Sequence, residues 1–218
     1  MRTVANSSLA TYTKISPNKT SPRNHVIDTI TIHCMGYRTA KWACDYFAKT
    51  DRKCSANYVV GYDGSIGVSV DEKDRSWCSS NRENDNRAIT IEVATEGKHP
   101  YRATDKAYSA LITLVYDICK RNGITKLVWS TEKKNRIYHL NGCNMTVHRD
   151  YANKACPGEY LYLRMGDIAT KVNAKLNKPE SKGGLYTVQV GAFSNKANAE
   201  EMLAKLKLAG FAGYIKEK

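Results

Sequence analysis

The sequence lacks any long apolar run. Across its 218 residues no stretch approaches the roughly 20 apolar residues that a membrane span needs, so we expect no membrane insertion. The N-terminal stretch MRTVANSSLATYTKISPNKT also lacks the apolar core of a secretory signal. We therefore expect synthesis in a reducing cytoplasm without a signal peptide, with thiols mostly free.

Two further patterns are missing. The 34 Lys and Arg outnumber the 21 Asp and Glu, which gives a net charge of +13, yet no Lys/Arg block typical of nucleic-acid-binding tails appears. The charge alone suits nucleic acid, anionic membranes and anionic wall polymers equally. Because the sequence contains no such nucleic-acid-binding motif, we do not expect nucleic acid as a partner. None of the seven cysteines forms a CxxC pair, which disfavours a redox or zinc-ribbon site.

Patterned strands and helices are present instead, and apolar residues make up 42% of the chain, enough for a core. β-branched alternation, the Asp63-Gly64 turn, the helix caps Thr39 and Thr104 and the helix stop Gly123 predict successive elements. These are strand 26–34, helix 39–50, a hairpin over 55–70, strand 87–95, helix 104–124, a short strand 125–130 and helix 157–176. Alternating strands and helices predict an α/β fold with a central sheet flanked by helices.

The composition shifts after residue 176. We expect one domain over residues 1–176, with 1–24 as an N-terminal arm, then a linker over 177–184 that is rich in Gly, Pro and Ser. Residues 185–218 read as strand, helix, strand. About 34 residues are too few to bury a core of their own, so this segment needs a partner.

Two histidines and one cysteine form a candidate metal site. His33 ends a predicted strand, and His148 and Cys156 lie eight positions apart in a loop-rich segment. Two imidazoles and a thiolate suit zinc, and three protein ligands leave a fourth position for water, as in catalytic sites. Spacing alone favours the alternative of a hydrogen-bonded core histidine and a small buried cysteine.

Glu92 is a second candidate. It lies inside ITIEVA, a strand that otherwise reads as buried, where a lone acid is costly unless it is paired or functional. Its neighbours Ile91 and Val93 should point to the opposite face of the sheet. From the residues alone, a carboxylate paired with Arg or Lys at a strand end is as good an interpretation as a catalytic group.

Five motifs in order resemble one family. They are TIHC, SANYVVGYDGSIG, DRSWCSSN, NRAITIEVA and TVHRDYANKACPG, spread over residues 24–176. They resemble the zinc amidases that include phage lysozyme-type amidases, cytoplasmic anhydromuropeptide amidases and animal peptidoglycan-recognition proteins. The resemblance implies the α/β fold of these amidases, with a mixed central sheet. It also implies N-acetylmuramoyl-L-alanine amidase activity on bacterial peptidoglycan. It implies one Zn²⁺ on His33, His148 and Cys156, Glu92 as general base and then acid, and Lys154 as the group that stabilises the oxyanion.

The sequence departs from the family near that site. Many relatives carry His where this chain has Asn57, and the phage lysozyme type has a catalytic Tyr where this chain has Ala56. We predict Asn57 and Trp77 as substrate-binding residues, although Trp77 reads equally well as a packing residue. The alternative function is a non-catalytic peptidoglycan-recognition module, although such relatives typically lack a zinc ligand.

The C-terminal segment VQVGAFSNKANAEEMLAKLKLAGF resembles one repeat of the sporulation-related (SPOR) domain. The resemblance implies a βαβ half-domain that binds peptidoglycan glycan strands. A single unit leaves an open sheet edge, so we expect a homodimer through residues 185–218, or else a truncated second repeat. With no signal peptide, we expect an endolysin of a phage or prophage, or a sporulation-stage lytic enzyme. Either would reach the cell wall by holin-type release or cell lysis.

Overall fold

The computed structural model describes residues 5–178 and 188–217, and the chain divides into two units, Met1–Lys178 and Pro179–Lys218. Most of the predicted linker 177–184, and residues 1–4 of the predicted arm, lie outside the described residues. Within the described part of the chain, no helix combines the length and the apolar character that crossing a bilayer requires.

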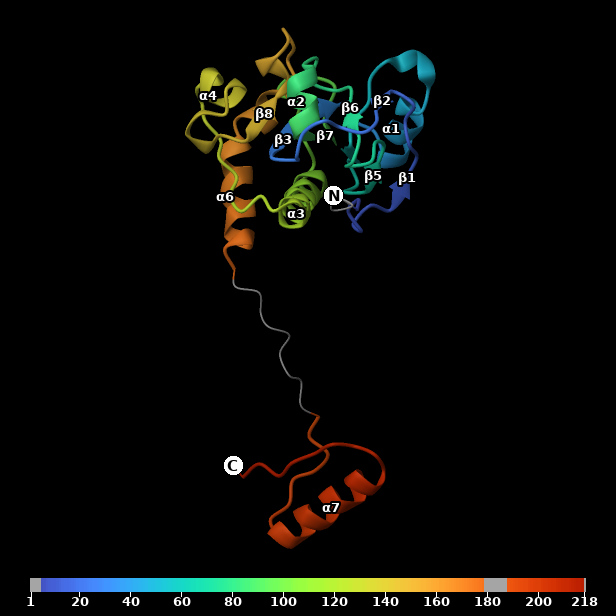
Figure 1. Ribbon diagram of the computed structural model, residues 1–218, viewed down its shortest axis with the longest axis vertical. Helices are drawn as coiled ribbons and strands as arrows, with labels where there is room; N and C mark the ends of the chain where they lie inside the picture. The colour runs from blue at the N-terminus through green and yellow to red at the C-terminus, as the bar shows by residue number, and fades with distance from the viewer. Residues whose placement is uncertain (1–4, 179–187, 218) are drawn as a thin grey trace. The chain divides into compact units, whose positions relative to one another are not determined.

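The N-terminal unit is built on a six-stranded sheet in the order β1-β5-β4-β7-β3-β8 (Figure 1). β4, β7, β3 and β8 run parallel, β5 pairs antiparallel with β4, and β1 runs parallel to β5. The bounds are β1 Tyr12–Thr13, β3 Thr29–Met35, β4 Tyr58–Val60, β5 Ile66–Val68, β7 Ala88–Ala94 and β8 Met145–Val147. A separate antiparallel pair joins β2 Lys19–Thr20 to β6 Arg75–Ser76. The predicted mixed sheet, its two long strands and the hairpin are confirmed.

Helices flank this sheet, as predicted (Figure 1). Their bounds are α1 Ala40–Phe47, α2 Arg82–Arg87, α3 Asp105–Asn122, α4 Lys133–Ile137, α5 Glu159–Tyr162 and α6 Met165–Leu176, with short 3₁₀ turns at Thr50–Arg52, Leu140–Gly142 and His148–Asp150. The predicted caps are present: the Thr39 hydroxyl accepts from the Trp42 amide, and Thr104 from the Ala107 amide. Gly123, with φ of 73°, ends α3 in the left-handed conformation.

The two faces of the sheet differ in chemistry. Ile30 and Ile32 of β3 join the main core, which also contains apolar side chains of α3 and α6. Thr31 and His33 alternate with them and therefore point to the opposite face. On that second face a smaller apolar cluster packs α1 against β4. The alternation thus separates a dry core from a face that carries polar groups.

Two predicted elements of the N-terminal unit differ from the structure. Residues 125–130 form no strand, because side-chain amides take the backbone donors: Asn173 Oδ1 accepts from the Leu127 amide and Asn144 Oδ1 from the Val128 amide, both at 2.8 Å. The predicted helix 157–176 is two helices, α5 and α6. The residue between them that precedes α6, Arg164, has φ of −102° and ψ of 2°, outside helical geometry.

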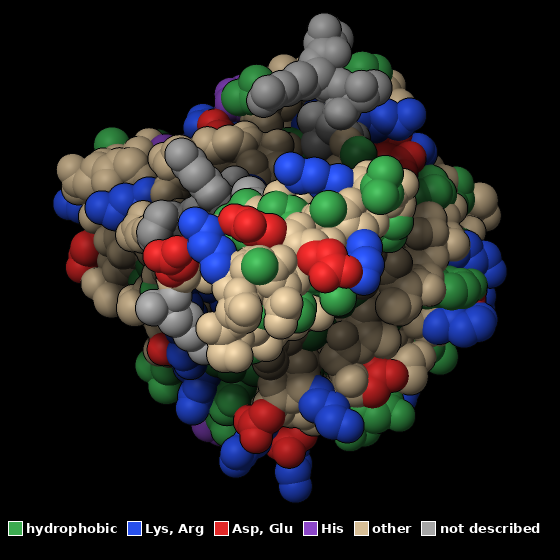
Figure 2. All heavy atoms as spheres, turned by 90° about the horizontal axis from the view of Figure 1, so that it is seen from below, with side chains coloured by type: hydrophobic (Ala, Val, Ile, Leu, Met, Phe, Trp, Pro, Cys, Tyr) green, Lys and Arg blue, Asp and Glu red, His purple; other side chains and the backbone are tan. Residues whose placement is uncertain are grey.

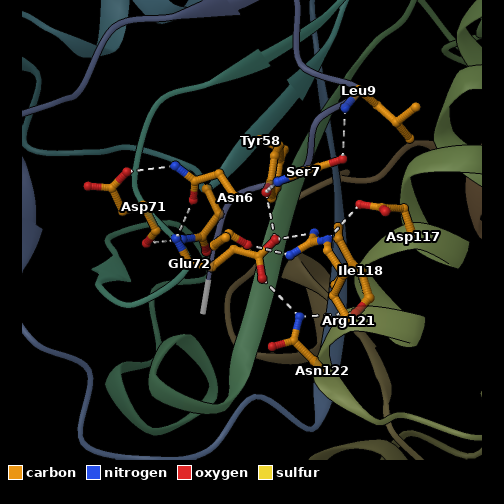
Figure 3. Close-up of polar contacts among 12 residues, drawn as sticks. Asn6, Ser7, Leu9, Tyr58, Asp71, Glu72, Asp117, Ile118, Arg121 and Asn122 are labelled. Carbon is orange, nitrogen blue, oxygen red and sulfur yellow. Dashed lines mark hydrogen bonds and ion pairs between the residues drawn. The ribbon is translucent and has the colours of Figure 1, made fainter. Parts of the chain in front are cut away.

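A buried carboxylate ties the N-terminal segment to the domain (Figure 3). Glu72 is fully buried and accepts from the Tyr58 hydroxyl at 2.6 Å, from Arg121 at 2.5 Å and from Asn122 at 2.8 Å. The Tyr58 oxygen in turn accepts from the Ser7 amide at 2.7 Å. One acid therefore links the loop after β5, strand β4, the end of α3 and the N-terminal segment.

The C-terminal unit contains α7, Lys196–Leu208, capped by Asn195. The described residues on either side of α7, 188–194 and 209–217, have no assigned strand. A strand is defined by backbone hydrogen bonds to a neighbouring strand, and residues 188–194 and 209–217 form no such pair. The predicted strand–helix–strand is therefore a single helix within the described residues. No residue of α7 is buried, and Val188 and Leu208 are 86% and 90% exposed. Figure 2 draws all the atoms of the chain, and on the face that it shows, Lys and Arg side chains are interspersed with acidic ones.

The Glu72 cluster yields a stability prediction. Glu72→Ala should lower the free energy of unfolding by about 3 kcal/mol, because it leaves a guanidinium and a tyrosine hydroxyl without their buried partner. The measurement is urea unfolding followed by circular dichroism. Glu132→Ala, at an exposed position, is the control and should change it by less than about 0.5 kcal/mol. Equal effects of the two substitutions would contradict a structural role for the cluster.

Candidate metal centre

Three of the predicted residues meet at the carboxyl ends of parallel strands. His33 lies near the end of β3, on the face opposite the main core. His148 directly follows β8, the neighbour of β3, and begins a 3₁₀ turn. Cys156 lies in the loop after that turn. The parallel order of β3 and β8 therefore brings together residues that are more than a hundred positions apart in sequence.

The donor atoms of His33, His148 and Cys156 all lie within 4.8 Å of one another. Cys156 Sγ is 3.5 Å from His33 Nδ1 and accepts from the Cys34 backbone amide at 3.3 Å. The two imidazole rings meet edge to face, with centroids 4.9 Å apart. His33 is fully buried, whereas His148 and Cys156 are half-buried, so the cluster opens on one side only.

The electrostatic setting favours neutral imidazoles. Burial, helped by the nearby His148, lowers the pKa of His33 to about 3. Burial also lowers the pKa of His148, with a smaller contribution from the positive charge of Lys154. The neighbouring Cys34 thiol and burial raise the pKa of Cys156 well above its ordinary value. A cation would therefore meet two imidazoles ready to bind and a thiol whose proton it must displace.

This donor set fits zinc. Two nitrogens and one sulfur, close enough to share one ion, match the three-ligand catalytic sites in which the fourth tetrahedral position stays open. The same three residues are those that the sequence singles out, and their role as metal ligands stays a prediction.

Glu92 lies beside the cluster. Strands β3 and β7 are parallel, and their register pairs His33 with Glu92, so both side chains point to the same face. Burial raises the pKa of Glu92 to about 7, and the thiol of Cys78, 3.9 Å from Oε1, opposes this weakly. The carboxyl therefore ionises as the pH rises through about 7, the range suited to a group that takes up and returns a proton.

The loop of the DRSWCSSN motif contacts the site through Ser80 and Cys78, two residues that the sequence analysis did not single out. Ser80 Oγ lies 3.0 Å from Nε2 of His148, which leaves Nδ1 as the ring nitrogen for a metal. The buried Asp85 carboxylate holds the loop by accepting from the amides of Cys78 at 3.0 Å and Ser79 at 3.1 Å. The only sequence signal for this loop is its place in the DRSWCSSN motif.

Lys154 and Trp77 have less defined positions. Lys154 is exposed, and its positive charge contributes to the lowered pKa of His148. Trp77 is half-buried, and its indole nitrogen donates to Thr20 Oγ1 at 3.0 Å. The roles of both residues toward a substrate stay predictions.

Asn57 has a structural role in the fold. It is fully buried, and its amide nitrogen donates to three backbone carbonyls at 3.3 Å, those of Val70, Asp71 and Asp74. Its oxygen accepts from the backbone amide of Thr90 at 3.2 Å. These contacts occupy the side chain's polar atoms in a structural role, and substrate binding by Asn57 stays a prediction. The side chain holds the loop after β5 against β7.

The sheet, with a cluster of donors at the ends of its parallel strands, defines an α/β protein with a candidate metal centre. Comparison with known families matches residues 23–159 to N-acetylmuramoyl-L-alanine amidase. This match covers more than half of the chain, which therefore belongs to that family. Residues 182–218 match the SPOR domain. No curated protein sequence matches the chain significantly.

Solved structures share the fold. PlyL is 17% identical, with a TM-score of 0.54 over 74% of this chain and 95% of that chain. A selenomethionine derivative of AmpD is 19% identical, with a TM-score of 0.54 over 75% and 96%. A mutant endolysin from Bacillus subtilis is 16% identical, with a TM-score of 0.54 over 75% and 99%. The predicted amidase fold is thereby confirmed.

The contact between Ser80 and His148 yields a binding prediction. Ser80→Ala should weaken Zn²⁺ binding by about 10- to 100-fold, because the ring loses the partner that sets its tautomer and orientation. Competition with a chromophoric chelator measures the affinity. Ser109→Ala, at an exposed position of α3, is the matched control and should bind like the unmodified protein. Affinity that is unchanged in Ser80→Ala would remove Ser80 from the site.

Proposed function

We propose that this protein is a zinc-dependent N-acetylmuramoyl-L-alanine amidase that cuts the amide between muramic acid and the first stem alanine of peptidoglycan. The observation that carries the proposal is the cluster of His33, His148 and Cys156, with Glu92 on the same sheet face in register with His33. Membership of the amidase family supports the same bond specificity. When bound, Zn²⁺ would supply a Lewis acid that lowers the pKa of a water molecule to about 7.

Two side chains carry the remaining chemistry. Glu92, with a pKa of about 7, accepts a proton from the attacking water and returns it to the departing amide nitrogen. Lys154, which is exposed, places an ammonium where negative charge develops on the carbonyl oxygen. We expect the substrate amide to enter between the half-buried Glu92 carboxyl and the exposed Lys154 ammonium, with Trp77 as a substrate-binding residue.

The proposed organisation follows the two matched families. Residues 1–176 form the catalytic domain, 177–184 a linker, and 185–218 a segment that binds the cell wall. A catalytic unit tethered to a wall-binding segment stays near its polymeric substrate. This arrangement suits a phage or prophage endolysin, or a sporulation-stage lytic enzyme, that acts on the wall after holin-type release or cell lysis. The positive net charge favours anionic wall polymers as additional partners.

The amidase proposal predicts chelator-sensitive release of amino groups. Purified Gram-positive walls incubated with the protein should release free N-terminal alanine, and a chelator or Cys156→Ser should abolish the release because the metal is lost. Readdition of Zn²⁺ should restore the chelated protein but not the variant. Release that ignores both treatments would defeat the proposal, and new reducing sugar ends would identify a glycosidase instead.

Glu92→Ala separates chemistry from metal binding. It should keep one Zn²⁺ per chain and lose at least about 100-fold in turnover, because the proposed proton acceptor is lost. Metal analysis and the same wall assay give the two values. Turnover equal to that of the unmodified protein would remove Glu92 from the mechanism.

The C-terminal unit supports a dimer. With no buried residue in α7 and exposed apolar residues on both sides of it, the unit needs a covering surface, and a second copy supplies one by two-fold symmetry. Sedimentation equilibrium at micromolar concentration should give twice the mass of the chain, and a chain ending at residue 178 should give a monomer. A full-length chain that stays monomeric would exclude this dimer.

The alternative function, a non-catalytic recognition module, does not account for Glu92 and Cys156. A module that only binds muropeptides needs no proton-accepting carboxyl beside three metal donors. The chelator experiment separates the two, because a recognition module would bind walls and release nothing.

A further inference from the structure

Cys78 is a nucleophilic side chain beside the site that the proposed mechanism does not use. It is half-buried, and its donor atom lies within 4.8 Å of those of His33 and Glu92. The three residues thus offer one sulfur, one nitrogen and one oxygen around a common point. His33 belongs both to this group and to the group with His148 and Cys156.

Two atoms of this second group are buried without a hydrogen-bond partner in the described residues: Nε2 of His33 and Oε2 of Glu92. His33 is fully buried, so bulk water has no access to hydrogen-bond with its ring nitrogen. Unpaired polar atoms at such positions are costly, and they typically mark a place where something binds.

The Cys78–Glu92 spacing fits a shared cation better than a direct contact. The thiol and Oε1 are 3.9 Å apart, at the outer limit for a sulfur hydrogen bond. Two ligands on one tetrahedral zinc, at ordinary Zn–S and Zn–O lengths, lie about 3.6 Å apart. A shift of a few tenths of an ångström would therefore bring both onto one ion.

The group is also held in place before any ion arrives. Adjacent parallel strands fix His33 and Glu92 through their backbone register. The Asp85 carboxylate fixes the Cys78 backbone by accepting from its amide at 3.0 Å. Ligands on rigid elements need little rearrangement to bind, so the cost of ordering them is already met.

We propose that the site contains a second position for a soft divalent cation, formed by His33, Cys78 and Glu92. The inference rests on the proposed function only through the shared His33. His33 is common to both groups: its Nδ1 lies 3.5 Å from Cys156 Sγ in the first group, and its Nε2 is the ring nitrogen without a partner. An ion in the second position occupies the Glu92 carboxylate and withholds it from proton transfer. The second position is therefore inhibitory.

Cadmium binding to full-length variants tests the proposal, with thiolate-to-metal charge-transfer absorbance as the readout. Cys156→Ser removes the thiol of the first position and should retain a thiolate–Cd²⁺ band from Cys78. Adding Cys78→Ser to that variant should abolish the band. Adding Cys54→Ser instead is the matched control, since Cys54 is a half-buried thiol close enough for Glu92 to raise its pKa but outside the group. Circular dichroism checks that each variant folds.

The outcomes are distinct. A band in Cys156→Ser that depends on Cys78 and not on Cys54 supports the second position. No band in Cys156→Ser, or one that survives Cys78→Ser, overturns it. The proposed function fails separately, if the unmodified protein shows no band that Cys156→Ser reduces or releases no alanine from walls.

Discussion

The pairing of β3 with β7 is the constraint on which the site depends. These two strands are parallel and in register over seven residues, from Thr29 with Ala88 to Met35 with Ala94. The register decides which side chains share a face, so a slip of one residue would move Glu92 into the apolar core. It places His33 and Glu92 side by side, while the isoleucines of both strands pack against α3 and α6. The apolar core therefore fixes the position of the polar site.

Buried polar side chains form a hydrogen-bond network that supports the strands on which the site lies. Thr31 and Thr146 share a hydrogen bond of 2.7 Å across β3 and β8, and the Asn84 side chain of α2 bonds to both. On the other side, Thr90 bonds to Ser76 and Asn57. Such networks stabilise a structure only when their members are satisfied, and these hold the strand ends in one arrangement. The short helix α2 thus contributes structure to the site although it contains none of the predicted site residues.

The sequence predicts regular elements well where one strong local signal decides them. The caps Thr39 and Thr104, the Asp63-Gly64 turn and the alternation in ITIHC and ITIEV each have a local physical cause, and the structure contains those elements. One prediction failed because distant side chains replace the backbone partners of a strand. Residues 125–130 look like a strand, but the amides of Asn144 and Asn173 take its hydrogen bonds.

The same division holds for the site. His33, His148, Cys156 and Glu92 stand out from the sequence through residue type and motif, because their chemistry is unusual at strand ends. The roles of Ser80, Cys78 and Asp85 depend on contacts across the fold and have no local signature. Asn57 shows the limit most clearly, since its motif position suggests a substrate contact while its burial makes it structural. The sequence by itself determined which donors exist and which strands carry them. Only the tertiary structure decided which donors meet, because parallel register and loop closure bring together residues that chain order keeps apart.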